Sequence, residues 1–352
     1  MIMDKKITLK DIADECGVTV QTASRILNSE YVKLYNSETV RKVKETAGRL
    51  GYRPNAFAQF IKTGKFHSIS LLLSPEISFS SFSIDYLILM EQKLAERNYN
   101  LLLNVLPGEH DIAEDKIPRI FKENLVDGAL VAITHAIPEW LESLIMTINV
   151  PIVWIGSKHD KDCVHHDDFK AAYDLTLHYA QKGFRKIFYV DMVISKDNKG
   201  PLHFSVKDRE EGYLKAMKKL GLKTFVMRPK KPLNAIDFAG YAKTILSSCK
   251  PPFAFLCYDF ENSGRNILYT ANNLGLRFHK DFELTCFSDK IHIENSTEIP
   301  AILPRKIDIV EAAVNMLFEK IERKNDVHKP VIIPFAFYGY NCEKNRILQN
   351  EK

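Results

Sequence analysis

The chain opens with two short segments in which apolar residues recur at helical spacing. Thr8 can cap the first segment, and Gly17 can end it in the left-handed conformation. Thr19 offers a second cap two residues later, and residues 20–28 form a second predicted helix with one apolar face. Two short helices joined by a tight glycine turn are the helix-turn-helix pattern.

Two further helices are predicted before residue 66. The third helix has Ser37 as its expected cap and ends at a glycine. Pro54 stops its continuation, Asn55 can cap a short fourth helix, and Gly64 ends that helix after about two turns. A helix of this length is marginal in water, so we expect it to form only when something holds its apolar side chains.

The outward side of the second helix carries polar side chains suited to reading DNA. They are Gln21, Thr22, Ser24, Arg25 and Asn28. Gln pairs with adenine and Arg with guanine through two hydrogen bonds, and Ser or Thr can meet bases or phosphates. A solvated polar face is the alternative for such a helix taken alone. On the third helix, four basic side chains suit phosphate contacts, namely Arg41, Lys42, Lys44 and Arg49.

From residue 67 the pattern changes to apolar strands alternating with amphipathic helices. A first set is predicted with strands at 68–74, 100–106, 128–133 and 151–156 and helices at 84–98, 111–122 and 138–147. A second set has helices at 166–183, 205–220, 235–248 and 262–274 and strands at 186–191, 224–227, 253–258 and 283–287. A helix at 307–323 and strands near 331–334 and 336–340 follow. The predicted class is α/β, with parallel sheets covered on both faces behind an all-α headpiece.

Charge changes this picture by separating the two regions. Residues 1–65 hold 12 Lys/Arg and 7 Asp/Glu, a net charge of +5, whereas residues 66–352 hold 37 of each. All the excess positive charge therefore lies in the helical module, which indicates a polyanionic partner for that module. With 352 residues and 45% apolar side chains, the chain is long enough for several cored domains.

Several other function classes find no support in the sequence. No stretch approaches the roughly 18 apolar residues of a membrane span, and no signal-peptide core is present, so we expect a cytoplasmic protein without a membrane partner. The six cysteines are dispersed, which favours reduced thiols. Adjacent side chains in residues 165–168 (His-His-Asp-Asp) point to opposite sides of an extended segment, so no metal site is expected there. No cofactor is expected either. No catalytic motif appears, and an enzyme is not predicted.

Residues 8–65 resemble the DNA-binding headpiece and hinge helix of the lactose/galactose repressor family of bacterial transcription regulators. The matching runs are TLKDIA at 8–13, GVT at 17–19, TASRILN at 22–28 and GYRPN at 51–55. The resemblance implies a headpiece at 1–53 and a hinge helix with linker at 54–65. It also implies DNA contacts from Thr8, Thr19, Val20, Gln21, Thr22, Ser24, Arg25, Asn28, Tyr52, Asn55, Ala56 and Ile61.

Four of these positions correspond to residues with specific roles in the family. Val20, Gln21 and Arg25 correspond to residues that read bases in the major groove, and Ile61 to a leucine that wedges into the minor groove. Ile61 is β-branched, so the wedge is stiffer but still apolar. The segment 29–36 is about two residues longer than is usual in the family.

The region 66–352 resembles the family's effector-binding core, which is similar to periplasmic sugar-binding proteins. This implies two lobes joined by three crossovers: lobe 1 at about 66–164 plus part of 290–325, and lobe 2 at about 165–289 plus the C-terminal strands. Effectors would lie beyond the carboxyl ends of strands. The expected effector contacts are Phe79, Asp167, Arg209 and Asp259, since carboxylates and an arginine suit a polyol.

Structural roles without a ligand remain open as alternatives for these residues. Arg209 and Asp259 could form a structural ion pair or be solvated charges. Phe79 and Trp154 could stack on a sugar face, or each could pack in the core. The core also departs from the family at three places: Tyr258 replaces Asn, Cys286–Asp289 (CFSD) replaces Gly-Phe-Asp-Asp, and Phe184 replaces His. These departures leave the ligand's identity open.

The resemblance implies a homodimeric, sequence-specific regulator that binds a pseudo-palindromic operator in double-stranded DNA. Repression is the expected outcome, with operator affinity modulated by a small effector such as a sugar or sugar derivative. One alternative is a regulator that answers to a protein partner or to nothing. Another is a solute-binding protein for uptake, against which the headpiece and the missing signal peptide argue.

Overall fold

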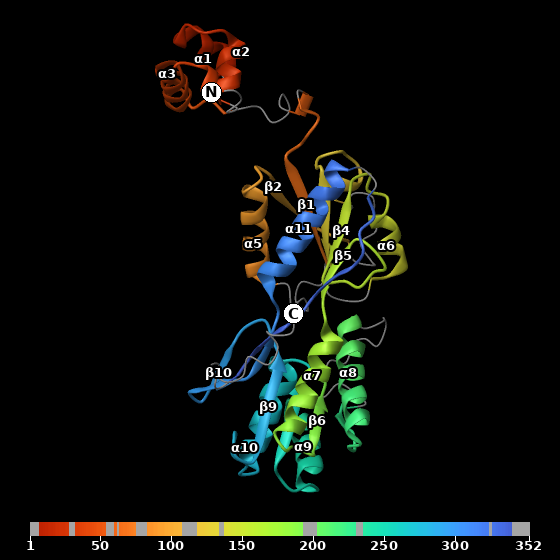
Figure 1. The fold of residues 1–352 in the computed structure, drawn as a ribbon. Coiled ribbons are helices and arrows are strands. Elements are labelled where there is room, and N and C mark those ends of the chain that lie inside the picture. The colour runs from red at the N-terminus through yellow and green to blue at the C-terminus, as the bar shows by residue number, and fades with distance from the viewer. Residues whose placement is uncertain are drawn as a thin grey trace. The chain divides into compact units, whose positions relative to one another are not determined.

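The structure is a computed structural model of the chain that describes residues 7–27, 32–53, 60–61, 63–74, 83–107, 118–133, 137–192, 203–229, 235–323 and 326–339. The chain divides into two compact units, residues 1–66 and 67–352. Figure 1 draws the first in red to orange and the second from orange to blue.

The first unit is helical, as predicted. Its elements are α1 (Leu9–Cys16), α2 (Val20–Leu27), the 3-10 turn η1 (Val32–Leu34) and α3 (Ser37–Arg49). Their apolar faces enclose a small core that includes Ile12, Ala23, Ile26 and Val43. Gly17 ends α1 with a φ of +68°, which a side chain would disfavour. The predicted cap of α3 was wrong: Ser37 is its first helical residue, and the side chain of Asn36 accepts from the Glu38 amide at 2.9 Å.

The predicted hinge helix is described only in part, because residues 54–59 and 62 lie outside the described ranges. The Gly64 amide donates to the Phe60 carbonyl at 2.7 Å, and Gly64 has a φ of +69°. That bond and that conformation are those of a last helical turn. The Phe60 ring stacks on Phe66 with a centroid distance of 4.0 Å.

The second unit contains two six-stranded sheets. The first sheet has the order β13-β5-β4-β3-β1-β2, with all neighbours parallel. Its strands are β1 (Ser68–Leu73), β2 (Asn100–Val105), β3 (Gly128–Ala132), β4 (Ile152–Ile155), β5 (Cys163–His166) and β13 (Val331–Ile333). Helices α5 (Ile84–Ala95) and α11 (Lys306–Glu322) pack on one face, and α6 (Glu139–Ile145) with the 3-10 turn η4 (Arg119–Phe121) packs on the other. These elements form the first lobe (Figure 1).

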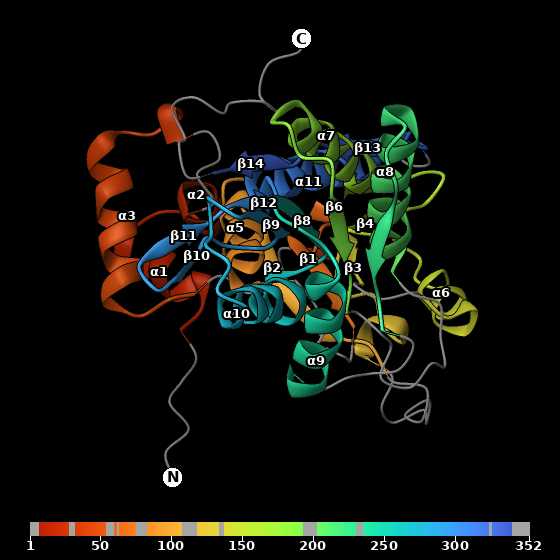
Figure 2. The ribbon, with the colours of Figure 1, turned by 90° about the horizontal axis from the view of Figure 1, so that it is seen from below.

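The second sheet has the order β14-β12-β9-β8-β6-β7, parallel except for the pair of β12 and β14. Its strands are β6 (Ile187–Val190), β7 (Phe225–Met227), β8 (Phe253–Cys257), β9 (Phe282–Phe287), β12 (Ala301–Leu303) and β14 (Ala336–Tyr338). Helices α7 (Asp168–Gln181) and α8 (Phe204–Leu220) cover one face, and α9 (Ala235–Ser247) and α10 (Arg265–Asn273) cover the other (Figure 2). A π-helical turn, η5 (Phe260–Gly264), precedes α10, and β10 (His292–Glu294) pairs with β11 (Thr297–Ile299). These elements form the second lobe.

The parallel α/β class and the three passages between lobes are confirmed. The chain crosses from β5 to α7, from β12 to α11 and from β13 to β14. The sequence missed β5, whose half-polar Cys-Val-His-His sequence is fully buried between β4 and β13, and it missed the β10–β11 hairpin. It also assigned both C-terminal strands to the second lobe, whereas β13 pairs with β5 in the first sheet. Of the predicted helix at 111–122, the described residues 118–122 hold only the turn η4.

Close packing of α7 against α8 brings Asp168 of the first helix beside Arg209 of the second. A Cβ at Gly212 would overlap the backbone carbonyl oxygen of Phe169. We expect Gly212→Ala to lower the free energy of unfolding by about 1–3 kcal/mol, because the two helices must move apart. Both tryptophans, Trp140 and Trp154, lie in the second unit, so urea unfolding followed by their fluorescence measures this. The control is Gly240→Ala in α9, where a Cβ meets open space. This change should raise the free energy of unfolding by at most about 1 kcal/mol, since alanine favours a helix more than glycine does.

Buried histidine makes the second unit sensitive to acid. Burial, followed by the positive charge of Arg209, lowers the pKa of His166 to about 3. The unfolded chain protonates this side chain near about pH 6.5, so between that pH and about 3 the unfolded state holds more protons and acidification favours unfolding. The loss is about 1.4 kcal/mol per pH unit within this window.

His166→Phe keeps the ring contact with Phe335, whose centroid lies 4.6 Å away, and removes the titrating group. Urea unfolding between pH 6 and 4 should therefore show a shallower loss of stability in this variant, by about 1.4 kcal/mol per pH unit. Parallel pH profiles for the two proteins would contradict this assignment.

Candidate functional site

Helix α2 separates an apolar face from a polar one. Ala23 and Ile26 are fully buried in the headpiece core, whereas Val20 and Gln21 are exposed. Ser24 and Arg25 are half-buried on the same outward side, one turn further along. Because residues four apart are neighbours on a helix, these side chains form one continuous surface.

Two threonines fix the starts of the helices that carry this surface. The Thr8 hydroxyl accepts from the Asp11 amide at 3.4 Å while Asp11 accepts from the Thr8 amide at 2.7 Å, which is a capping box. Thr19 Oγ1 accepts from the Thr22 amide at 3.1 Å and lies 2.9 Å from the Thr22 hydroxyl. Both exposed caps therefore position helix N-termini, which point backbone N–H groups outward.

Most of the basic side chains of α3 have partners inside the headpiece. Arg41 pairs with Glu45 at 2.9 Å, Arg49 pairs with Glu15, and Lys42 Nζ donates to the Cys16 carbonyl at 3.1 Å. The Arg41–Glu45 pair lies within α3, whereas the contacts of Arg49 and Lys42 hold α3 against α1. Lys44 is exposed on the same helix.

The remaining predicted DNA contacts are spread more widely. Tyr52 packs against the headpiece core, its amide donates to Ala47, and burial raises the pKa of its phenol. Ile61 is 69% exposed. Asn28, Asn55 and Ala56 lie outside the residues that the structure describes.

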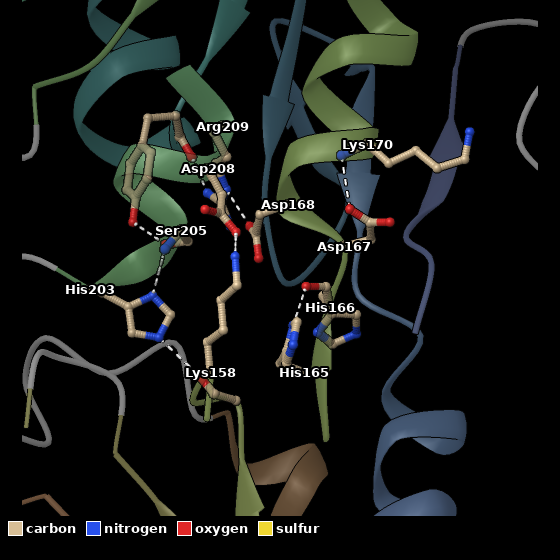
Figure 3. A network of polar contacts seen from close by, with 12 residues as sticks. Lys158, His165, His166, Asp167, Asp168, Lys170, His203, Ser205, Asp208 and Arg209 are labelled. Carbon is tan, nitrogen blue, oxygen red and sulfur yellow. Dashed lines mark hydrogen bonds and ion pairs between the residues drawn. The ribbon is translucent and has the colours of Figure 1, made fainter. Parts of the chain in front are cut away.

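In the second lobe, Arg209 is the centre of a buried polar network (Figure 3). Its Nε donates to Asp168 Oδ1 at 2.6 Å, and its Nη1 donates to the Tyr258 carbonyl at 2.8 Å. Only 14% of the Arg209 side chain and 4% of the Asp168 side chain are exposed. The guanidinium also lies over the rings of Phe287, at 3.8 Å, and Tyr258, at 4.6 Å. Burial opposes the charge on Arg209, but the carboxylate of Asp168 together with the phenols of Tyr258 and Tyr189 outweighs it and raises the arginine's pKa.

The two other described candidates, Asp167 and Asp259, both cap helices. Asp167 accepts from the Lys170 amide at 2.9 Å at the start of α7 (Figure 3). Asp259 Oδ1 accepts from the Asn262 and Ser263 amides at 3.2 and 2.7 Å, which starts η5. Arg209 therefore pairs with Asp168 and not with Asp259, so the expected alternative of an Arg209–Asp259 ion pair was wrong.

Of the two aromatic candidates, Phe79 and Trp154, the structure describes only Trp154. Phe79 lies outside the described part of the chain. Trp154 is buried among apolar residues of the first lobe and stacks on His159 with a centroid distance of 4.2 Å. Trp154 is thus a core residue of the first sheet.

The first lobe also brings charged and phenolic groups toward this network. Burial raises the pKa of Asp289, and the positive charges of Lys306 and Arg209 offset part of this rise. The pKa of Tyr86 is raised first by burial and then by the negative charges of Asp289 and Asp168. Lys306 Nζ donates to Asp85 at 2.6 Å and to Ser83 at 3.0 Å. Groups from both lobes therefore influence one another electrostatically.

Sequence reasoning missed Asp168, Tyr258 as a hydrogen-bonding group, and Phe287. Asp168 stands next to the predicted Asp167, and only the helix start distinguishes the two: Asp167 is the cap, whereas Asp168 is turned into the interior.

No described helix is long and apolar enough to cross a membrane. Within the described ranges, no three His, Cys, Asp or Glu side chains are grouped to hold a metal ion.

Comparison with known proteins places these two regions in one family. Residues 8–55 match the model "Bacterial regulatory proteins, lacI family". Residues 67–253, more than half of the chain, match "Periplasmic binding proteins and sugar binding domain of LacI family".

Individual relatives agree with these matches. The HTH-type transcriptional regulator RegA of Clostridium saccharobutylicum is 34% identical over 221 residues, which span 61% of this chain and 62% of RegA. The sucrose operon repressor of Staphylococcus xylosus is 28% identical over 77% of each chain. The solved structure of the Lac repressor dimer bound to operator and the anti-inducer ONPF superposes with a TM-score of 0.70, covering 95% of this chain and 98% of that one at 17% identity.

The low identity to the Lac repressor makes that likeness a likeness of fold. The two family models, one on each unit of the chain, decide membership. The chain belongs to the LacI family of bacterial regulatory proteins.

Proposed function

We propose that this protein is a sequence-specific DNA-binding transcription regulator that acts as a repressor. The observation that carries the proposal is the outward surface of α2, where Gln21, Ser24 and Arg25 lie side by side on a helix held by its own core. Gln and Arg are the side chains best suited to adenine and guanine edges in the major groove. The net charge of +5 on residues 1–65 suits the phosphate backbone.

The other headpiece residues have supporting roles in this proposal. Val20 meets a thymine methyl, and the helix N-termini capped by Thr8 and Thr19 face phosphates with Thr22, Tyr52 and Lys44. The exposed Ile61 unstacks a base step in the minor groove. Asn28, Asn55 and Ala56 remain proposed contacts on the strength of the family resemblance alone.

We also propose a homodimer, since two headpieces read the two halves of a pseudo-palindromic operator. Exposed apolar side chains gather on α5 and on β2, the edge strand of the first sheet: Ile84, Ile88, Leu102, Leu103 and Val105. An apolar edge strand left in water invites pairing with another chain. The cytoplasm, where the DNA is, is the proposed location, and no enzymatic step is proposed.

The proposed effector is a small sugar or sugar derivative held at the Arg209 network. Arg209 supplies donors in a fixed orientation because Asp168 and the Tyr258 carbonyl hold it. A carboxylate has about four acceptor sites, so Asp167 and Asp259 can still accept from ligand hydroxyls while they cap their helices. The name of the sucrose operon repressor of Staphylococcus xylosus points to the same class.

Arg25→Ala tests the DNA-reading role. Once a preferred duplex has been selected from random DNA, we expect this variant to lose about 1–3 kcal/mol of specific binding and much less of its binding to unrelated DNA. Fluorescence anisotropy at several salt concentrations measures both. Lys44→Ala is the matched control: it should weaken binding to all duplexes and reduce the salt slope by about one. Equal losses on both duplexes for Arg25→Ala would show that Arg25 touches only phosphate.

A thermal-shift screen of the full chain against sugars, sugar phosphates and nucleosides tests the effector. We expect a saturable hit that raises Tm, since a ligand that binds the folded state alone stabilises it, and that changes affinity for the selected duplex. The Arg25→Ala protein should keep the thermal shift, because its change lies in the other unit. Intact DNA binding with no hit would favour control by a protein partner, or none.

A further inference from the structure

The loop that follows β4 in the first lobe meets the start of α8 in the second lobe. The Gly156 carbonyl oxygen lies 2.9 Å from His203 Nε2. Lys158 Nζ lies 2.7 Å from Asp208 Oδ2 and 5.8 Å from the centre of the Phe204 ring. Figure 3 shows Lys158 reaching up to Asp208 and the His203 ring lying between the loop and Ser205.

The chemistry of the groups fixes the direction of each bond. A carbonyl oxygen only accepts, so His203 Nε2 must carry the hydrogen, and in the neutral ring Nδ1 is then an acceptor. His203 Nδ1 lies 2.8 Å from Ser205 Oγ and 3.4 Å from the Ser205 amide, which it caps. The Ser205 hydroxyl therefore donates to the histidine, and its oxygen accepts from the Tyr258 hydroxyl at 2.9 Å.

This chain of bonds begins beside the proposed effector site. The carbonyl of Tyr258 holds Arg209 at 2.8 Å, and its ring lies under the guanidinium. Serial hydrogen bonds polarise one another, so each donor depends on the one before it. The donor order is Tyr258, Ser205, His203 and then the carbonyl of Gly156 in the other lobe.

We propose that Tyr258, Ser205 and His203 form a one-directional hydrogen-bond latch that holds the first lobe against α8, with Lys158–Asp208 as a second clasp. Ser205 and His203 are positioning residues: they make contact between the lobes depend on the Tyr258 hydroxyl. The regulatory meaning of the latch rests on the proposed function, because it places an interlobe contact under the control of the site around Arg209.

Hydrogen exchange of the full chain, without DNA or effector, tests the latch. Tyr258→Phe removes only the hydroxyl in the second lobe, yet exchange of the amides of residues 156–158 in the first lobe should rise about fivefold, the equilibrium change for one neutral hydrogen bond. Lys158→Met should raise exchange at residues 203–208 on the opposite side of the contact.

The matched control is Tyr213→Phe, which removes another buried hydroxyl of the second lobe, bonded to the Ile187 carbonyl at 2.8 Å. It should leave residues 156–158 unchanged. Unchanged exchange there in Tyr258→Phe, or an equal rise in both tyrosine variants, would overturn the latch. Neither result bears on DNA binding, which the Arg25→Ala comparison tests separately.

Discussion

The pairing of Arg209 with Asp168 is the constraint on which the second lobe is organised. Both charges are almost completely withdrawn from water, and an uncompensated buried charge costs several kcal/mol. Asp168 is the first residue of α7 and Arg209 lies in the second turn of α8. The two can meet only because α7 and α8 pack closely, and that contact depends on the missing side chain at Gly212.

The same pair determines which hydrogen-bond donors of Arg209 remain for a ligand. Arg209 has five donors, of which Nε and one Nη1 hydrogen are committed to Asp168 and the Tyr258 carbonyl. Phe287 and Tyr258 confine the plane of the guanidinium. An arginine held in this way loses little freedom when it binds, so its unused donors are preorganised. The ion pair is therefore part of the proposed site and not an alternative to it.

The headpiece follows a different physical principle, because local interactions define its first two helices. Caps at Thr8 and Thr19, the glycine turn and apolar positions at helical spacing define α1 and α2, whereas α3 is joined to α1 by residues 26 and 34 positions apart. The Arg49–Glu15 ion pair and the Lys42 contact that join α3 to α1 use residues predicted to face phosphate. Charged side chains on a helix surface thus make contacts within the headpiece as well as with partners, and the spacing of charged positions alone does not distinguish the two roles.

The sequence by itself determined most of the order of helices and strands, the helix-turn-helix and the α/β class, because apolar periodicity, caps and glycines act over a few residues. It also singled out Arg209, Asp167 and Asp259 through the family resemblance. Only the tertiary structure decided that Asp168 is the partner of Arg209 and that β13 joins the first sheet beside β5. The first of these joins residues 41 positions apart in the chain, and the second joins residues more than 160 positions apart. Such distant groups leave no mark in local spacing, since pairing across the fold is fixed by burial and by the need to satisfy charge and hydrogen bonds once the lobes have formed.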